Sequence, residues 1–452
     1  MKSNLNQSTI WLTVSFTFLS CCFGSGLLSI PSIAVKMGIV PFVLMNVFAT
    51  LFCAFCFKQI IEHQDKRKCQ EKTLTSLISR YYGKVWLIFV DLSIIFCLLP
   101  ISYIAVSADY FRNFLIEIFD VTVMNNNGWV VGMKFITCLC VMFPLTFIKT
   151  IKVLNYVASL SLVFVMVSVI YVIVRFIQWK STGLLNNVIH PAPSPAIWPA
   201  SSAMIPDVLT YITMFFSLYS MHASLVCIMH EYATDFQVPV QVVKTQIQRA
   251  VFWVALPVAF VVYTGYGLLG VFMFDQTCTQ EQIGCIKANP NILLTFTGDT
   301  AAVVIELLFS IVVFVSFPCM LYPIRKSVLT FTKLNGENFW IYNSVGFGIT
   351  VLCLLIAVFL DDVSQIQSFS ANLMGIILYG VSGVMLWYKI NEKVQGDAEE
   401  MGLVEDNSVQ GEREVQKTEQ PKWRTYVFWT SIVLLVMLNL AAIGCQVYTW
   451  VR

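Results

Sequence analysis

Eleven apolar runs, each about 20 residues or longer, constrain the fold of this chain more than any other feature. A helix needs about 20 consecutive apolar residues to cross the hydrocarbon of a membrane. Transmembrane strands would instead alternate apolar and polar residues over about 10 positions, and these runs do not alternate. The sequence therefore predicts an all-α polytopic membrane protein with eleven transmembrane helices, at 10–30, 39–61, 86–115, 129–149, 153–178, 207–229, 249–274, 300–323, 341–360, 366–388 and 424–451.

Composition excludes several other classes of protein. Charged residues make up 12% of the 452 residues, whereas an ordinary soluble domain carries about 25%. The chain therefore lacks the polar surface that a large soluble enzyme would need to cover its apolar residues. A net charge of +2 gives no electrostatic reason to expect a nucleic-acid partner. We expect the lipid bilayer, and no nucleic acid, around this protein.

Lysine and arginine residues predict how the helices are oriented. Most of the 28 lie in segments that share one side of the membrane if the N-terminus is cytoplasmic, as the positive-inside rule requires. The cytoplasmic segments then include a short N-terminus, 1–9, and a polar linker, 389–423, that we expect to be disordered. The proline-rich segment 179–206 is predicted to lie extended over the outer surface. The eleventh helix, within 424–452, carries the C-terminus to the outside or lumen.

Without this last helix, the remaining spans divide into two sets of five, 10–178 and 207–388. Because five is an odd number, the second set must enter the membrane from the opposite side. Two similar sets that enter from opposite sides are typical of transporters built from an inverted repeat. In such transporters the substrate site lies near the bilayer midplane, where helices of the two repeats are interrupted.

The first span contains Gly24, Ser25 and Gly26, and Pro31 follows five residues later. Two glycines and a proline so close together predict a helix that is broken in mid-membrane. An unwound backbone at that depth must face protein or a water-filled cavity. Its N–H groups can hold a carboxylate and its C=O groups a cation. The alternative is that these small residues pack against a neighbouring helix.

The sixth span is polar but less clearly interrupted. Ser217, Ser220, His222 and Ser224 stand where apolar residues would be expected, and polar residues inside spans usually face the bundle interior. This stretch has no glycine or proline, so a break is less evident than in the first span. The serine hydroxyls could instead bond to the backbone of their own helix.

Most of the 14 cysteines lie inside predicted spans, where they act as small apolar residues. The two closely spaced pairs, Cys53 with Cys56 and Cys138 with Cys140, have no histidines nearby, so they do not predict a metal centre. Cys278 and Cys285 differ, because both fall in the predicted outside loop 275–299. They predict either a disulfide in an oxidising compartment or two unpaired loop thiols.

Motifs in several spans resemble those of one transporter family. Residues 24–31 of the first span read G-S-G-L-L-S-I-P, and residues 316–325 of the eighth read S-F-P-C-M-L-Y-P-I-R. His222 and Glu231 of the sixth span and the glycine-rich stretch 265–270 of the seventh are weaker matches. On these residues the chain resembles the amino acid/auxin permease family, which includes sodium-coupled and proton-coupled amino acid transporters.

The resemblance implies the LeuT-like fold, a five-plus-five inverted repeat with one further helix at the C-terminus. This agrees with the independent count of spans. One departure affects the sixth span: members of the family often carry a proline after the histidine, whereas this chain has Ala223-Ser224. The family's helix break is therefore not reproduced in full by the residues of this span.

The resemblance also implies an amino acid zwitterion as the substrate. Backbone N–H groups of the first span would bind its carboxylate, and carbonyls of the first or sixth span would bind its ammonium group. Three aromatic residues, Tyr103, Phe216 and Tyr219, are candidate gates, although each could simply pack in the core. The predicted substrate-binding residues are Gly24, Ser25, Gly26, Leu27, Tyr103, Phe216, Ser217 and Ser220.

A coupling ion, Na⁺ or H⁺, is the only further component that we expect. The resemblance to LeuT-like folds implies a sodium site between the first and eighth spans, where Ser310 and Ser316 offer hydroxyls and Cys22 or Phe23 offers a backbone carbonyl. A proton would need a group that titrates inside the membrane, such as His222 or Glu306. His222 could equally be neutral and bonded to a carbonyl, so the sequence leaves the two ions open.

Alternatives from other classes are weaker. A membrane enzyme would need a convergent catalytic or metal motif, and the four histidines are scattered. A channel would need a filter sequence of the kind that oligomers repeat around a pore. An amino acid sensor with little transport stays open, because it would bind the same ligand. We expect a monomer in the plasma membrane or in a lysosomal or vacuolar membrane.

Overall fold

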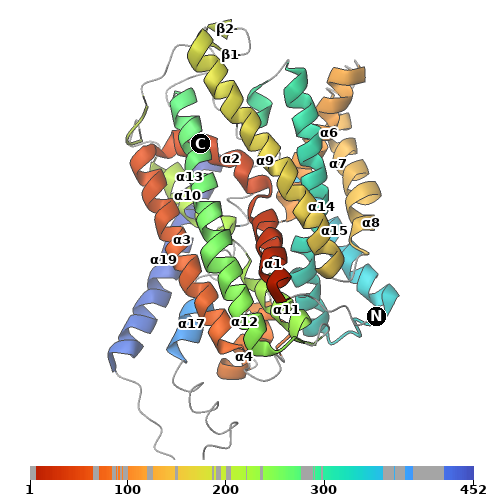
Figure 1. Cartoon of the computed structure of the whole chain (residues 1–452), viewed down its shortest axis with the longest axis vertical. Coiled ribbons are helices and arrows are strands. Elements are labelled where there is room, and N and C mark those ends of the chain that lie inside the picture. The colour runs from red at the N-terminus through yellow and green to blue at the C-terminus, as the bar shows by residue number, and fades with distance from the viewer. Residues whose placement is uncertain are drawn as a thin grey trace, which may run out of the picture.

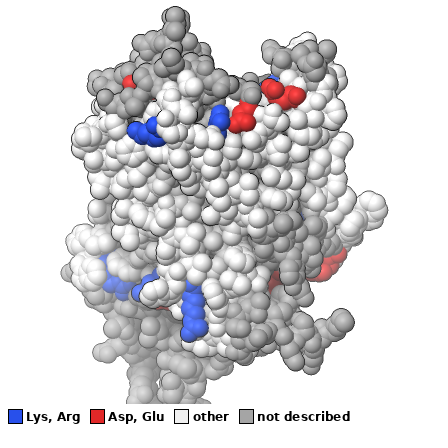
Figure 2. Space-filling model, turned by 45° about the horizontal axis from the view of Figure 1, so that its top comes forward, with Lys and Arg blue, Asp and Glu red and all other residues white. Residues whose placement is uncertain are grey.

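The protein is an all-α bundle whose long helices run mostly along one axis (Figure 1). The computed structural model describes residues 7–64, 71–83, 88, 90–91, 94, 100–119, 126–147, 151–185, 188–189, 195–199, 205–219, 221–234, 238–275, 289, 291–296, 299–359, 371, 382–389 and 422–451. On the face shown in Figure 2, charged side chains lie towards two opposite ends and leave an uncharged belt between them. This distribution suits a protein surrounded by lipid at mid-height.

The helices in chain order are α1 (Gln7–Cys22), α2 (Ser25–Met37), α3 (Ile39–His63), α4 (Leu74–Tyr82), α6 (Pro100–Phe119), α7 (Asn127–Ile136), α8 (Phe143–Leu145), α9 (Ile151–Thr182), α10 (Ile205–Leu218), α11 (His222–Thr234), α12 (Val240–Gln248), α13 (Leu256–Met273), α14 (Thr300–Thr332), α15 (Phe339–Phe359), α17 (Ser382–Tyr388) and α19 (Lys422–Val451). π-Helical turns join α7 to α8 (η2, Thr137–Met142) and α12 to α13 (η4, Arg249–Ala255), and a 3-10 turn (η5, Ile292–Thr295) precedes α14. Strands β1 (Leu184–Leu185) and β2 (Val188–Ile189) form a short antiparallel hairpin.

Among the described residues, eight helical segments are long and apolar enough to cross a membrane. Each overlaps one predicted span: Ile39–His63, Gly128–Leu145, Leu162–Thr182, Val208–Thr234, Val240–Met273, Thr300–Thr332, Phe339–Phe359 and Trp423–Val447. The first predicted span forms two shorter helices, and the structure describes 86–115 and 366–388 only in part. The count of eleven therefore stays a prediction.

Several helices run beyond the predicted limits of their spans. Helix α9 continues to Thr182 and α14 to Thr332, whereas the apolar runs end at 178 and 323. Backbone hydrogen bonding can continue in the helix after the apolar residues end, because it does not depend on the membrane. The predicted linker 389–423 lies almost entirely outside the described residues, as do Cys278 and Cys285.

The first span is broken, as the sequence predicts. Helix α1 ends at Cys22 and α2 begins at Ser25, with Gly24 in an extended conformation between them. Pro31 lies inside α2 and does not break it. The glycine supplies the space that the break needs, since a Cβ at Gly24 would lie 2.1 Å from the hydroxyl oxygen of Tyr103.

The sixth span is broken too, although its sequence has no glycine or proline at this point. Helix α10 ends at Leu218 and α11 begins at His222. The N–H of Met221 bonds to the carbonyl of Tyr219 at 2.8 Å, which is a tight turn and not a continuing helix. The sequence showed polarity here, but the break itself depends on what Tyr219 contacts elsewhere in the fold.

Close contacts hold α2, the second half of the broken first span, against α13. A Cβ at Gly270 of α13 would lie 2.6 Å from the Cβ of Pro31 in α2, and one at Gly267 would lie 2.2 Å from the ring of Phe42 in α3. Glycine is therefore what lets α13 pack directly on α2. Outside this contact, the N–H of Ile39 bonds to the carbonyl of Ala196 at 2.9 Å, so part of the predicted outer loop lies against the α2–α3 junction.

Candidate functional site

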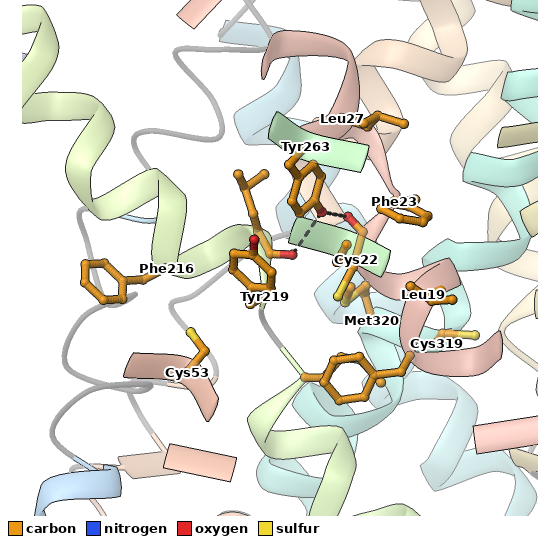
Figure 3. Close-up of a cluster of buried hydrophobic side chains, with 14 of the residues drawn as sticks. Leu19, Cys22, Phe23, Leu27, Cys53, Phe216, Tyr219, Tyr263, Cys319 and Met320 are labelled. Atoms are coloured by element: carbon orange, nitrogen blue, oxygen red, sulfur yellow. Dashed lines mark hydrogen bonds between the residues drawn. The ribbon is translucent and has the colours of Figure 1, made fainter. Parts of the chain in front are cut away.

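The two helix breaks meet at one tyrosine. Tyr263 of α13 donates its hydroxyl to the carbonyl of Cys22, the last residue of α1. The same hydroxyl lies 3.2 Å from the carbonyl of Leu218, the last residue of α10. Figure 3 shows both hydrogen bonds as dashed lines around Tyr263. The breaks of the first and sixth spans are therefore neighbours in the core.

Opposite ends of helix dipoles meet at this point. The carbonyls of Cys22 and Leu218 lie at the C-terminal, negative ends of α1 and α10. Helix α2 starts beside them with its positive end, and its N-cap residue, Gly24, has no side chain to cap the first-turn N–H groups. A molecule that carries one negative and one positive group matches this arrangement. Leu27 is the exception among the predicted donors, because its N–H bonds to the carbonyl of Gly24 at 3.2 Å.

Aromatic rings fill the space around the breaks. The ring of Tyr263 makes edge contacts with Phe23 and Tyr219, at centroid distances of 5.6 and 5.5 Å. Tyr103 of α6 lies against Gly24 and is buried. Phe216 is the predicted gate that the structure does not bring here. Its ring points away from the cluster in Figure 3 and packs on Phe52 at 5.4 Å.

Hydrogen bonds anchor the break of the sixth span to α3 and α13. The hydroxyl of Tyr219 donates to the Oδ1 of Asn46 at 2.9 Å and accepts from the hydroxyl of Thr50 at 2.8 Å. The Nδ2 of Asn46 donates to the hydroxyl of Thr264 at 2.8 Å. Sequence reasoning missed Asn46 and Tyr263. An asparagine inside the apolar second span was the available signal, whereas nothing in the sequence singled out Tyr263 over other tyrosines.

The predicted serines have different surroundings. Ser217 donates to the carbonyl of Met214 at 2.8 Å, and Ser310 donates to the carbonyl of Glu306 at 3.0 Å. Both thus bond to their own helix, which was the alternative to ligand binding. Ser316 is fully buried, and its hydroxyl has no hydrogen-bond partner within the described part of the chain. Ser220 lies outside the described residues.

Ser316 lies on α14, which packs against α1. Cys319 and Met320 of α14 lie in the same side-chain cluster as Cys22 (Figure 3). Residues three and four positions apart share one face of a helix, so Ser316 lies one turn away on the face that carries these two side chains. Among the predicted sodium ligands, Ser316 and the Cys22 carbonyl are therefore on adjoining helices, α14 and α1.

The two candidate proton carriers lie on different helices, α11 and α14. His222 is the first residue of α11, is fully buried and stacks on Phe57, with ring centroids 4.2 Å apart. Glu306 accepts a hydrogen bond from the Nδ2 of Asn113 at 3.3 Å. It precedes Ser316 by ten residues on α14, or about 15 Å along the helix axis. His222 therefore belongs to a helix break, and Glu306 does not.

The motif of the eighth span forms a second polar cluster. Tyr322 donates its hydroxyl to the Oε1 of Glu231, which links α14 to α11. Arg325 is buried, donates to the carbonyl of Thr146 at 2.9 Å and lies over the ring of Tyr342 at 4.2 Å. The two most polar residues of this motif therefore bind neighbouring helices and do not approach the breaks.

A family model described as transmembrane amino acid transporter protein matches residues 7–446. The chain belongs to this family. It is 21% identical over 269 residues to solute carrier family 38 member 8 of Mus musculus, covering 57% of this chain and 56% of that protein. It is 22% identical over 325 residues to vacuolar amino acid transporter 6 of Saccharomyces cerevisiae, covering 69% and 64%. The matched regions thus span little more than half and just under two thirds of these two relatives.

A solved structure shows the same fold. It is Mhp1, a nucleobase-cation-symport-1 family transporter, in a closed conformation with bromovinylhydantoin bound. The TM-score is 0.53 at 10% sequence identity, and the match covers 97% of this chain and 93% of that one. At this identity the likeness concerns the fold alone. It agrees with the transporter architecture expected from the sequence.

Proposed function

We propose that this protein is a secondary active transporter that carries amino acids across a membrane by alternating access. One observation supports the proposal most directly: two interrupted helices present backbone carbonyls and a helix N-terminus to one buried point. A polar site in the middle of an apolar bundle would be costly to maintain without a ligand that uses it. Family membership agrees with the proposal.

The proposed substrate is an amino acid in its zwitterionic form. Its carboxylate binds the N–H groups of Ser25 and Gly26 at the start of α2, where the helix dipole favours an anion. Its ammonium group binds the carbonyls of Cys22 and Leu218, at the negative ends of α1 and α10. Tyr103 lies against Gly24 and closes the site from the side of α6. No non-protein cofactor takes part in this proposal.

The proposed driving force is a gradient of Na⁺ or H⁺. Sodium has its best candidate ligands in the Ser316 hydroxyl and the Cys22 carbonyl, because hard cations prefer oxygen ligands. A proton has its best candidate carrier in His222, which adjoins the break of the sixth span. Sodium coupling and proton coupling depend on different residues, so substitutions at these residues distinguish the two ions in one experiment.

The proposed architecture has two repeats and one further helix. Eleven transmembrane helices are arranged as a five-plus-five inverted repeat with a last helix, α19, outside the repeat. The N-terminus is cytoplasmic and the C-terminus is outside or lumenal. The protein works as a monomer in a plasma, lysosomal or vacuolar membrane.

Uptake into proteoliposomes tests the proposal. Purified protein is reconstituted and supplied with a mixture of the twenty radiolabelled L-amino acids, under an imposed sodium gradient or an imposed proton gradient. We expect uptake under one gradient only. Gly26→Leu should abolish this uptake by filling the first break, whereas Gly348→Leu, on an open face of α15, should not. Binding without uptake under either gradient would favour an amino acid sensor and contradict the transport proposal.

A further inference from the structure

We propose that the hydroxyl of Tyr263 occupies the position of a cationic group, and that ligand binding displaces it. Tyr263 would then be a specificity-determining residue. Only a ligand or ion with a positive charge interacts more favourably at this position than the hydroxyl does. The inference rests on the proposed transport function and adds a residue of α13 to the substrate site.

The contacts of Tyr263 are those that a bound cation would make. Its hydroxyl lies between the carbonyls of Cys22 and Leu218, donating to the first and 3.2 Å from the second. These carbonyls end two different half-helices, so they come together only in the folded core. A group that bridges them joins the two breaks in the absence of any ligand.

The hydroxyl is an incomplete match for this position. A tyrosine hydroxyl has one proton, so it makes one strong hydrogen bond where two carbonyls are available. It also carries no net charge, although both carbonyls lie at negative helix ends. An ammonium group brings three protons and a positive charge, and a sodium ion brings the charge. Either one satisfies both carbonyls better than the hydroxyl does.

The exchange that we propose requires a movement of the Tyr263 ring within its packing. Its ring is fully buried and meets Phe23 and Tyr219 edge to face, at interplanar angles of 86° and 88°. Tyr219 is itself held by Asn46. In the proposed exchange the Tyr263 ring tilts against these two edge contacts and takes the hydroxyl away from the carbonyls.

The substitution Tyr263→Phe distinguishes a hydroxyl that the ligand displaces from a hydroxyl that binds the substrate directly. It removes the hydroxyl that competes with the ligand for the two carbonyls. These carbonyls then lack a hydrogen-bond donor only while no ligand is bound. The ligand then no longer has to break a hydrogen bond, so binding should become tighter. Hydrogen bonds within membrane bundles average about 0.6 kcal/mol and reach about 1.7 kcal/mol, which correspond to a decrease in Kd of about 3-fold to 18-fold. A tyrosine that bound the substrate directly would give the opposite change.

The experiment measures Kd in full-length protein reconstituted in lipid nanodiscs. One arm uses the labelled L-amino acid that dominates uptake by the wild type, with choline replacing sodium. The other arm titrates sodium chloride alone and follows tryptophan fluorescence. Tyr266→Phe is the matched control, because Tyr266 lies on the same helix, is equally buried and has no hydrogen-bond partner for its hydroxyl among the described residues.

A tighter Kd for the amino acid in Tyr263→Phe, with no change in Tyr266→Phe, supports displacement by the ammonium group. A tighter Kd for sodium supports displacement by the ion. Unchanged or weaker binding in both arms overturns the inference while leaving uptake by the wild type, and hence the transport proposal, intact. Absence of uptake by the wild type would count against transport, and absence of both binding events would overturn the inference as well.

If Tyr263→Phe does not fold, the wild type provides a second measurement. A 2-hydroxy acid with the same side chain as the transported amino acid lacks the ammonium group and cannot displace the hydroxyl. Without sodium, it should not compete with the labelled amino acid. Competition at the same concentration as the unlabelled amino acid would overturn displacement by the ammonium group, and the sodium arm on the wild type would then decide the remaining case.

Discussion

Replacing Gly270 by alanine should push α2 away from α13. The added Cβ would lie 2.6 Å from the Cβ of Pro31 and 2.7 Å from its Cα and carbonyl oxygen. Carbon atoms pack at about 3.5–4.0 Å, so α2 must move by roughly 1 Å. The neighbouring atoms belong to a backbone and a proline ring, which cannot rotate out of the way. Overpacking of this kind costs about 1–3 kcal/mol.

Gly265→Ala provides the matched control on the same helix, because a Cβ there meets nothing within 4 Å. Both substitutions remove the helix penalty of glycine, about 0.5–1 kcal/mol, so this contribution cancels when the two variants are compared. We therefore expect Gly270→Ala to be less stable than Gly265→Ala by about 1–3 kcal/mol. Unfolding titrations with sodium dodecyl sulfate in mixed micelles measure this difference.

The same displacement should reduce uptake, because α2 carries the proposed carboxylate donors at its first turn. Gly265→Ala should transport like the wild type. Equal stability of the two alanine variants would refute the reasoning, since it would mean that α2 and α13 do not pack as closely as the structure indicates.

Three further predictions concern single side chains of α14 and their contacts. If sodium drives transport, Ser316→Ala should lower the apparent affinity for sodium in uptake assays, whereas Ser310→Ala should not, since that hydroxyl already bonds to its own helix; equal effects would remove Ser316 from the ion site. Tyr322→Phe and Glu231→Ala should be non-additive in unfolding titrations, with a coupling energy of about 0.6–1.7 kcal/mol, and strict additivity would contradict their hydrogen bond. Arg325→Lys should destabilise the protein by about 0.5–2 kcal/mol through loss of the stacked guanidinium, and a variant as stable as the wild type would refute this.

The sequence accounts well for the membrane spans. Residues such as those of 39–61 and 341–360 are apolar over a length that only a transmembrane helix satisfies, and the structure forms helices at both. The break at Gly24 could be predicted equally well, because a glycine pair near a proline is a local signal that tertiary contacts rarely override. The ends of the helices could be predicted less well from the sequence. Helix α14, for example, continues to Thr332, beyond the end of its apolar run.

The residues of the candidate site could be predicted only in part from the sequence. Gly24 and Tyr103 are in contact, as expected of two residues at one site, but Phe216 packs on α3 and Ser217 bonds within α10. Which face of a helix a residue occupies depends on the rotation of that helix, and apolar spans give little information about rotation because lipid and core are both apolar. Ser316 and Ser310 illustrate this: the residue types are identical, and only the packing of α14 separates them.

The sequence by itself determined that the chain crosses the membrane repeatedly and that its first helix is interrupted, because both features follow from hydrophobicity and backbone freedom over short stretches. Tertiary structure decided that the sixth span breaks at Tyr219 without glycine or proline, since Asn46 and Thr50 bind the tyrosine from another helix. It also decided that Tyr263 lies between the two breaks. Contacts between residues more than 200 positions apart, such as Tyr263 and Cys22, depend on how the helices pack, and no local pattern encodes them.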